Sequence, residues 1–247
     1  MTFAPNNALE LVMSAGDEWQ SWRALRLAGD DPGELPSIPG QDELGAFGGA
    51  SGRPSPGATG SAICHLKLIG LSSSAPAVVA ADWLIDVRTP AQAWLDAPDD
   101  VPGVVDTAAA GRVWATSAAA CGLLALGRDP GQRAIDLLRG EADQAGRFTG
   151  GAYPTFAAAG AYWQAEGPKT EMAEWALRWA RERLEEEVWD AMELVDALIL
   201  WSAAGIPSEH LTVEVFTETL RNSAPTPGWP DDLELTLRAA EILSAAR

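Results

Sequence analysis

The chain has few of the residues from which strands, redox pairs and nucleic-acid-binding surfaces are built. No segment of its 247 residues alternates apolar and polar positions over a run rich in β-branched side chains, so strands are not expected. The two cysteines, Cys64 and Cys121, lie in runs of small apolar residues and form no Cys-x-x-Cys pair. This pattern indicates buried free thiols and argues against a redox pair or a zinc knuckle.

Basic residues are also scarce. Lys and Arg together number 17 against 35 Asp and Glu, which gives a formal net charge of −18. Such a chain repels nucleic-acid phosphate and anionic lipid. The acidic residues are spread over the whole length with no acidic tail, which is typical of a solvated exterior.

The N-terminal segment lacks the features of an export signal. It has no basic leader, and Glu10, Asp17 and Glu18 interrupt its apolar positions. No apolar run reaches the roughly 18 residues that a membrane span needs. We therefore expect a cytoplasmic protein without a transmembrane segment, whose partners exclude nucleic acid and which could form an oligomer.

Helical patterns fill most of the chain. Alanine-rich segments have high helix propensity, and glycine and proline separate them at Gly70, Gly127, Gly167 and Gly205 and between residues 225 and 230. The sequence predicts an all-α protein with helices at about 8–28, 58–71, 75–88, 108–126, 131–144, 153–166, 170–185, 188–204, 208–222 and 232–246.

Two kinds of helix alternate in this prediction. The run from Trp114 to Leu126 carries no charge, and a helix without a polar face must be buried on most sides. The segment 170–185 is amphipathic instead, with Met172, Trp175, Ala176 and Trp179 at i, i+3, i+4 and i+7 spacing. Alternating buried and amphipathic helices are expected of a ring of helical hairpins in two layers.

The hairpins also repeat. An aromatic residue follows successive amphipathic helices at Trp94, Phe148, Trp189 and Trp229, and the last three are about 40 residues apart. A period near 40 with one helical hairpin in each unit is typical of a repeat architecture, in which neighbouring units stack to bury their apolar faces. We treat residues 1–247 as one domain.

Two connections interrupt the repeat. Residues 29–57 are rich in glycine and proline, and a connection of this length is expected to be a lid or a binding loop. Its apolar residues Leu35, Ile38, Leu44 and Phe47 could cap a cavity. The second connection, residues 89–107, contains Asp96, Asp99, Asp100 and Asp106.

These repeats resemble those of the squalene-cyclase and prenyltransferase superfamily. Trp83-Leu84 leads through Gln92 to Trp94, Leu137-Leu138 leads through Gln144 and Gly146 to Phe148, and Gly228-Trp229 precedes the last helix. Thr116 and Thr155 fall near the starts of the following inner helices, as in that repeat. The likeness covers most of 58–246 and implies an α/α-barrel, or toroid, of about five to six hairpins around an apolar cavity.

The resemblance also implies a kind of chemistry. Class II terpene cyclases protonate an alkene or epoxide with the middle carboxyl of an Asp-x-Asp-Asp-Thr segment, and neighbouring carboxylates keep that group protonated because like charges raise a pKa. Residues 232–236 place Glu234 at the donor position with Asp232 before it, although Leu235 replaces the last Asp. Asp106 precedes Thr107 and is the alternate donor. The same acidic residues would also serve as ordinary helix caps or surface pairs.

Eleven tryptophans give the chain an unusual supply of aromatic faces. On inner helices they would line a cavity that stabilises a carbocation through cation–π attraction, whereas at repeat junctions they would only pack. The residues expected to contact a substrate are Trp114, Trp163, Trp201, Tyr162, Tyr153 and Phe156.

Other chemistries find less support. Asp30-Asp31-Pro32-Gly33-Glu34 matches the magnesium-binding letters of class I terpene synthases, but Pro-Gly suits a turn and no second metal-binding motif follows. A zinc site needs three or four convergent ligands, and the chain has only His65 and His210 with no Asp-x-Cys. No hydrolase elbow or phosphate-binding loop is present. No metal or cofactor is expected.

Two functions follow from these patterns. The first is a terpene-cyclase-like enzyme that binds a hydrophobic isoprenoid or polyene in a central cavity and catalyses its acid-initiated cyclisation or rearrangement. The alternative is a non-catalytic α/α-toroid that binds a partner protein or a lipid.

Overall fold

The computed structural model describes residues 5–103, 107–168, 170–186 and 189–245, and the regular elements of this part of the chain are helices joined by turns and loops. It contains isolated β-bridges but no named strand. A short 3-10 helix covers Pro98–Asp100. The α-helices of the described part are α1 (Pro5–Ala15), α2 (Glu18–Ala28), α3 (Pro56–Leu68), α4 (Ala75–Asp86), α5 (Ala108–Ala125), α6 (Gln132–Arg139), α7 (Ala152–Glu166), α8 (Glu171–Glu186), α9 (Ala191–Ala203), α10 (Leu211–Ser223) and α11 (Leu233–Ala245).

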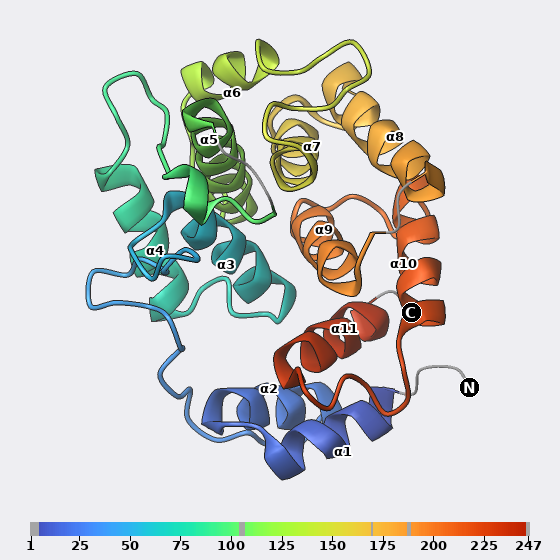
Figure 1. Ribbon diagram of the computed structural model, residues 1–247. Helices are drawn as coiled ribbons and strands as arrows, with labels where there is room; N and C mark the ends of the chain where they lie inside the picture. The colour runs from blue at the N-terminus through green and yellow to red at the C-terminus, as the bar shows by residue number, and fades with distance from the viewer. Residues whose placement is uncertain (1–4, 104–106, 169, 187–188, 246–247) are drawn as a thin grey trace.

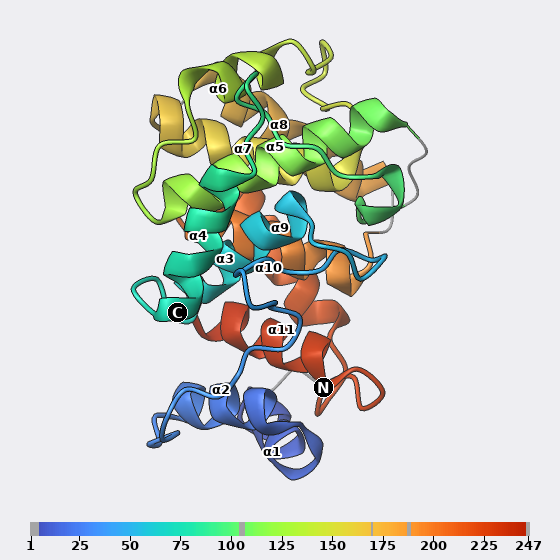
Figure 2. The same cartoon turned by 90° about the vertical axis from the view of Figure 1, so that its left-hand side faces the viewer.

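The helices form two layers. Helices α3, α5, α7, α9 and α11 make the inner layer, and α4, α6, α8 and α10 lie outside them (Figure 1). Helices α1 and α2 lie next to α11, at the end of the molecule opposite α6 (Figure 2). Trp19 and Trp22 of α2 share a buried cluster with Ile63 and Leu66 of α3, so α2 completes the ring. The predicted all-α, α/α-barrel architecture is confirmed.

The two layers follow from the composition of their helices. Every residue of α7 from Tyr153 to Trp163 is buried, as expected for a helix without a polar face. The outer helix α6 buries only Ala134, Ile135 and Leu138 and turns its charged side chains to solvent. No helix in the described part is long and apolar enough to cross a lipid bilayer.

A repeated hydrogen bond fixes four of the aromatic turns that lead into an inner helix. The backbone N–H of the turn aromatic donates to a threonine hydroxyl of the next inner helix, which leaves no buried amide unpaired. Four repeats use it: Phe47 to Thr59 at 2.9 Å, Trp94 to Thr116 at 3.2 Å, Phe148 to Thr155 at 2.9 Å and Trp229 to Thr236 at 2.7 Å.

Helices α3 and α5 approach each other closely because glycine lies at their contact. A Cβ atom on Gly60 would lie 2.2 Å from the carbonyl oxygen of Ala118, and one on Gly122 would lie 2.5 Å from that of Gly60. Only the absence of a side chain permits this spacing. The close pairing sets the position of α3, which supplies one wall of the cavity described below.

The first predicted helix, residues 8–28, is wrong as a single element. It divides at Gly16 into α1 and α2, because Asp17 accepts a hydrogen bond from the Gln20 amide and Gln20 caps Asp17 in return. This capping box starts a new helix in the middle of a continuous apolar pattern. The chain thereby gains a helix beyond the ten that were predicted.

The long connection at 29–57 contains a further repeat turn. A bridge joins Gln41 to Phe47 as another joins Ala142 to Phe148, and Phe47 is buried beneath it. The expectation that Leu44 caps a cavity is wrong, since its side chain is 71% exposed. The segment belongs to the ring itself, as its first aromatic turn.

Candidate functional site

A cavity of about 670 Å³ lies within the ring, bounded by α2, α3, α9, α11 and the turn that contains Phe47. Its size suits a small-molecule ligand. Its lining includes aromatic, aliphatic and charged side chains. The lining residues are Asp17, Trp19, Gln20, Ile38, Pro39, Phe47, Gly48, Gly49, Ala50, Ala58, Ser61, Ala62, His65, Leu66, Asp100, Pro102, Trp114, Tyr153, Asp196, Leu200, Glu234 and Arg238.

Polar side chains from four helices form one side of the cavity, which we call the ionic wall: Gln20, His65, Asp196, Glu234 and Arg238. Arg23 lies behind it and is 2% exposed. The guanidinium of Arg23 donates to both carboxylate oxygens of Glu234, at 2.7 and 2.9 Å, and to both oxygens of Glu241, at 2.8 Å each. One arginine of α2 therefore holds two glutamates of α11.

The ionic wall contains two further polar pairs. Nε2 of His65 lies 2.8 Å from Oε2 of Glu241 and 3.2 Å from a terminal nitrogen of Arg23. Arg238 pairs with Asp196. These contacts join α2, α3, α9 and α11 on one side of the cavity.

Burial and the pairing with Arg23 set the charge states of Glu234, Glu241 and His65. Burial alone would raise the pKa of Glu241, but the charge of Arg23 and the hydrogen bonds from His65 and Arg23 lower it to about 2. Burial and Arg23 act in the same opposed way on Glu234, and its pKa is lowered. Burial lowers the pKa of His65. The glutamates are thus carboxylates, and His65 is a neutral imidazole at pH 7.

A second part of the cavity lining, which we call the aromatic wall, consists of Trp114 and Tyr153 with the turn at 47–50. The two rings meet edge to face, with centroids 6.2 Å apart. Nε1 of Trp114 is buried and has no hydrogen-bond partner among the described residues. The indole fits there because residue 57 is glycine: a Cβ on Gly57 would lie 2.1 Å from that nitrogen.

Two aspartates flank the aromatic wall. Oδ2 of Asp96 accepts hydrogen bonds from Oγ of Ser55 and the amide of Gly57, each at 2.9 Å. Burial nevertheless raises the pKa of Asp96 to about 6. Asp100 accepts from the amide of Ser51 at 2.9 Å, and although burial opposes ionisation, the bonds from Ser51 and the charge of Arg53 lower its pKa.

The predicted acid residues occupy different positions. Glu234 lies on the ionic wall, where Arg23 favours its ionised form over the protonated form that a proton donor needs. Asp232 caps α11 by accepting from the amide of Leu235 at 2.9 Å, and it is not among the lining residues. Asp106 lies outside the residues that the structure describes.

The predicted aromatic residues also divide into two groups. Trp114 and Tyr153 line the cavity. The other four pack among the helices: Nε1 of Trp201 donates to the carbonyl of Phe156, the Tyr162 hydroxyl donates to Ile135, and Trp163 meets the ring of His210. These four are not among the cavity-lining residues.

Arg23, His65, Glu241 and Asp96 were not among the predicted site residues. Arg23 had a signal, because it is a charged residue within the apolar stripe that Trp19 and Trp22 form. His65 stands out in the sequence only as one of two histidines, too few for a zinc site, and Glu241 belongs to no motif. Their pairing joins residues up to 218 positions apart, which no local pattern reveals.

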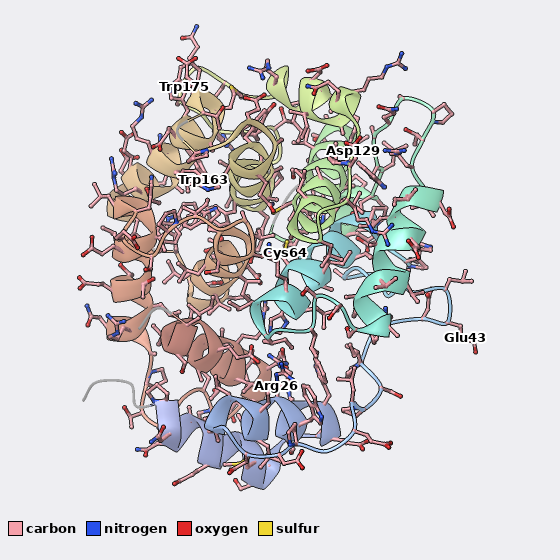
Figure 3. The ribbon with its side chains drawn as sticks, turned by 180° about the vertical axis from the view of Figure 1, so that it is seen from behind. Arg26, Glu43, Cys64, Asp129, Trp163 and Trp175 are labelled. Atoms are coloured by element: carbon pink, nitrogen blue, oxygen red, sulfur yellow. The ribbon has the colours of Figure 1, made fainter. Side chains whose placement is uncertain are left out.

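Cys64 and Cys121 are buried free thiols with their sulfur atoms 3.7 Å apart. Cys64 lies near the centre of the molecule, while Glu43 and Asp129 lie at its edge (Figure 3). Among the described residues, no group of three or more His, Cys, Asp or Glu is placed to hold a metal ion.

No protein-family model and no curated protein matches the chain. Its fold does match solved structures. The apo type II terpene cyclase MstE from Scytonema is similar over 98% of this chain and 86% of its own, with a TM-score of 0.51 and 15% identity. A variant of MstE in complex with geranylgeranyl dihydroxybenzoate, its substrate, gives a TM-score of 0.52 with 14% identity over the same shares. The chain therefore has a class II terpene-cyclase-like fold.

Proposed function

We propose that the protein binds a hydrophobic isoprenoid or polyene in its central cavity and catalyses an acid-initiated cyclisation or rearrangement. The observation that carries this proposal is a cavity of about 670 Å³ inside a cyclase-like ring, with indole and phenol faces on its wall. The geranylgeranyl ligand of the MstE variant supports the choice of guest.

The aromatic wall suits the intermediates of such a reaction. Protonation of an alkene leaves a carbocation, which an aromatic face stabilises without forming a bond to it. A dry cavity keeps water from trapping the cation before the next ring closes. Trp114 and Tyr153 supply such faces, and we assign them to this role.

Three carboxyl groups are candidates for the proton donor. Glu234 lies on the cavity wall, and it can donate a proton only after its pair with Arg23 opens and the carboxylate takes up a proton from solvent. Asp106 matches only the last Asp of the motif, before Thr107, and is the alternate donor. Asp96 lies beside Trp114 across Gly57 and has a raised pKa, which favours a protonated carboxyl.

Turnover of polyenes tests the proposal. Wild type, Glu234→Gln, Asp106→Asn and Asp96→Asn are incubated with farnesyl and geranylgeranyl substrates, and the products are identified by mass spectrometry. Loss of the acid should lower kcat by at least ~10²-fold. Asp99→Asn is the matched control, because this neighbouring side chain is 67% exposed. Unchanged turnover in all three variants removes the acid assignment.

One observation favours the alternative of a non-catalytic toroid that binds a lipid. Each described carboxylate on the cavity wall already accepts from a donor: Asp17 from Gln20, Asp100 from Ser51, Asp196 from Arg238 and Glu234 from Arg23. Tight binding of a polyene by wild type with no product after prolonged incubation would support this second function.

A further inference from the structure

The imidazole of His65 offers the cavity a hydrogen-bond acceptor. Nε2 of His65 lies 2.8 Å from a Glu241 carboxylate oxygen, which can only accept. Nε2 must therefore carry the proton and donate it to Glu241. The nearby Arg23 nitrogen, at 3.2 Å, is itself a donor and cannot pair with a protonated Nε2.

This tautomer leaves Nδ1 of His65 with a free lone pair. No described residue forms a hydrogen bond to Nδ1, and the ring lines the cavity. Glu241, which is 5% exposed, fixes the tautomer from behind the wall. The group that matches a free acceptor is a hydrogen-bond donor on the guest.

The charges of the cavity disfavour an anionic guest. Four carboxylates line it, from Asp17, Asp100, Asp196 and Glu234, and the one lining guanidinium is that of Arg238. Arg238 is already paired with Asp196. Arg23, behind the wall, already donates from Nε and both terminal nitrogens to Glu234 and Glu241. A diphosphate would enter an excess of negative charge, and no cation among the described lining residues is unpaired to receive it.

We propose that the cavity takes an uncharged isoprenoid with a terminal hydroxyl group, which donates to Nδ1 of His65, and that it discriminates against prenyl diphosphates. This inference rests on the proposed function, since it assumes an isoprenoid guest, and it names the head group of that guest. A hydroxyl supplies the donor that His65 lacks, whereas an ionised diphosphate has only acceptor atoms.

Nitrogen NMR of the wild-type protein tests the acceptor directly. The chain has two histidines, so the ring resonances of His65 and His210 are easily assigned. The expected free state of His65 is neutral with the proton on Nε2. Geranylgeraniol should shift the Nδ1 resonance of His65 and leave that of His210 unchanged. A proton on Nδ1 in the free protein, or no shift at saturation, overturns the proposal.

Binding constants test the discrimination. Quenching of tryptophan fluorescence, to which Trp19 and Trp114 on the wall contribute, measures the Kd of geranylgeraniol, its methyl ether and geranylgeranyl diphosphate with and without magnesium. The alcohol should bind roughly fivefold more tightly than the ether, which lacks the donor, and at least about tenfold more tightly than the diphosphate.

Two histidine variants complete the test. His65→Phe should lose the preference for alcohol over ether, whereas His210→Phe, on the outer helix α10, should keep it. If His65→Phe fails to fold, the NMR result on wild type decides. A diphosphate that binds as tightly as the alcohol overturns this inference alone. Failure of all three ligands to bind overturns the proposed function as well.

Discussion

Arg23 holds two acidic side chains of α11 on a single buried guanidinium. Arg23→Met should lower the free energy of unfolding by about 3–5 kcal/mol, because it leaves Glu241 as an uncompensated buried charge. Chemical denaturation at pH 7 measures the effect. Arg26→Met is the control on the same helix, since the Arg26 side chain is exposed, and it should change stability by less than about 0.5 kcal/mol.

The ion pair between Arg23 and Glu241 also predicts how acid unfolds the protein. The pKa of Glu241 is about 2 in the folded state against an ordinary value of 4.5, so its ionisation stabilises the fold above pH 4.5 and this contribution is lost as the pH falls towards 2. In Arg23→Met the pKa of Glu241 should rise, and the loss should begin at higher pH. An acid-unfolding midpoint that is the same in wild type and Arg23→Met would contradict the charge states assigned to the ionic wall.

Asp96 should give the opposite pH dependence. Its folded pKa of about 6 exceeds the ordinary value of 3.8, so the protonated form contributes stability below pH 3.8 that is lost as the pH rises through 6. Asp96→Asn should therefore gain stability relative to wild type between pH 4 and 7, by roughly 1–3 kcal/mol. Urea titrations at pH 4 and pH 7 measure the difference. If the difference in unfolding free energy between wild type and Asp96→Asn is the same at both pH values, burial does not penalise the Asp96 carboxylate.

At the scale of the element, a threonine joins each of four aromatic turns to its inner helix. Thr155→Val keeps the shape of the side chain but leaves the buried amide of Phe148 without an acceptor, which should cost about 1–3 kcal/mol. Thr219→Val is the control, because the Thr219 hydroxyl bonds only to the Val215 carbonyl within its own helix. Equal thermal stability of the two variants would argue against a role for the turn bond.

Helix contact distances depend on glycine at the α3–α5 crossing. Gly60→Ala forces a methyl group against the Ala118 backbone and should destabilise the protein by about 1–3 kcal/mol, although alanine is the better helix former. A Cβ on Gly140 would meet only an ordinary van der Waals contact, 3.6 Å from the Leu137 carbonyl oxygen, at an ordinary helical φ of −76°, so Gly140→Ala should be neutral or slightly stabilising. Thermal unfolding of both variants measures the contrast, and a stabilised Gly60→Ala would mean that the helices separate easily.

At the scale of the whole molecule, several helices of the ring together line the cavity. A larger side chain on one of these helices should therefore fill it. Ala62 of α3 lines it, so Ala62→Phe should weaken polyene binding at least about tenfold while the fold is retained. Val78→Phe, on the exposed side of α4, is the control and should bind as wild type does. Fluorescence titration and circular dichroism provide the two measurements. Undiminished binding by Ala62→Phe would place the guest elsewhere.

The sequence by itself determined the elements and their layers. Helices with a long charge-free run, such as α5 from Trp114 onward, must be buried, amphipathic ones such as α8 must cover them, and glycine and proline mark the boundaries between them. The distribution of charge along a helix and the glycine and proline residues at its ends are both local signals, because helix periodicity and turn chemistry act over a few residues. The all-α ring and its likeness to cyclases could therefore be predicted. The break at Gly16 was missed because the apolar pattern runs on through the capping box at Asp17.

Only the tertiary structure decided which side chains face the cavity. Trp114 and Trp201 both lie in apolar segments that the sequence assigns to inner helices, yet Trp114 lines the cavity and Trp201 packs against Phe156. Likewise the charge state of Glu234 depends on Arg23, which lies 211 positions away along the chain. The physical reason is that the direction of a side chain and the pKa of a carboxyl depend on neighbours that closure of the ring brings together, and those neighbours leave no trace in local spacing.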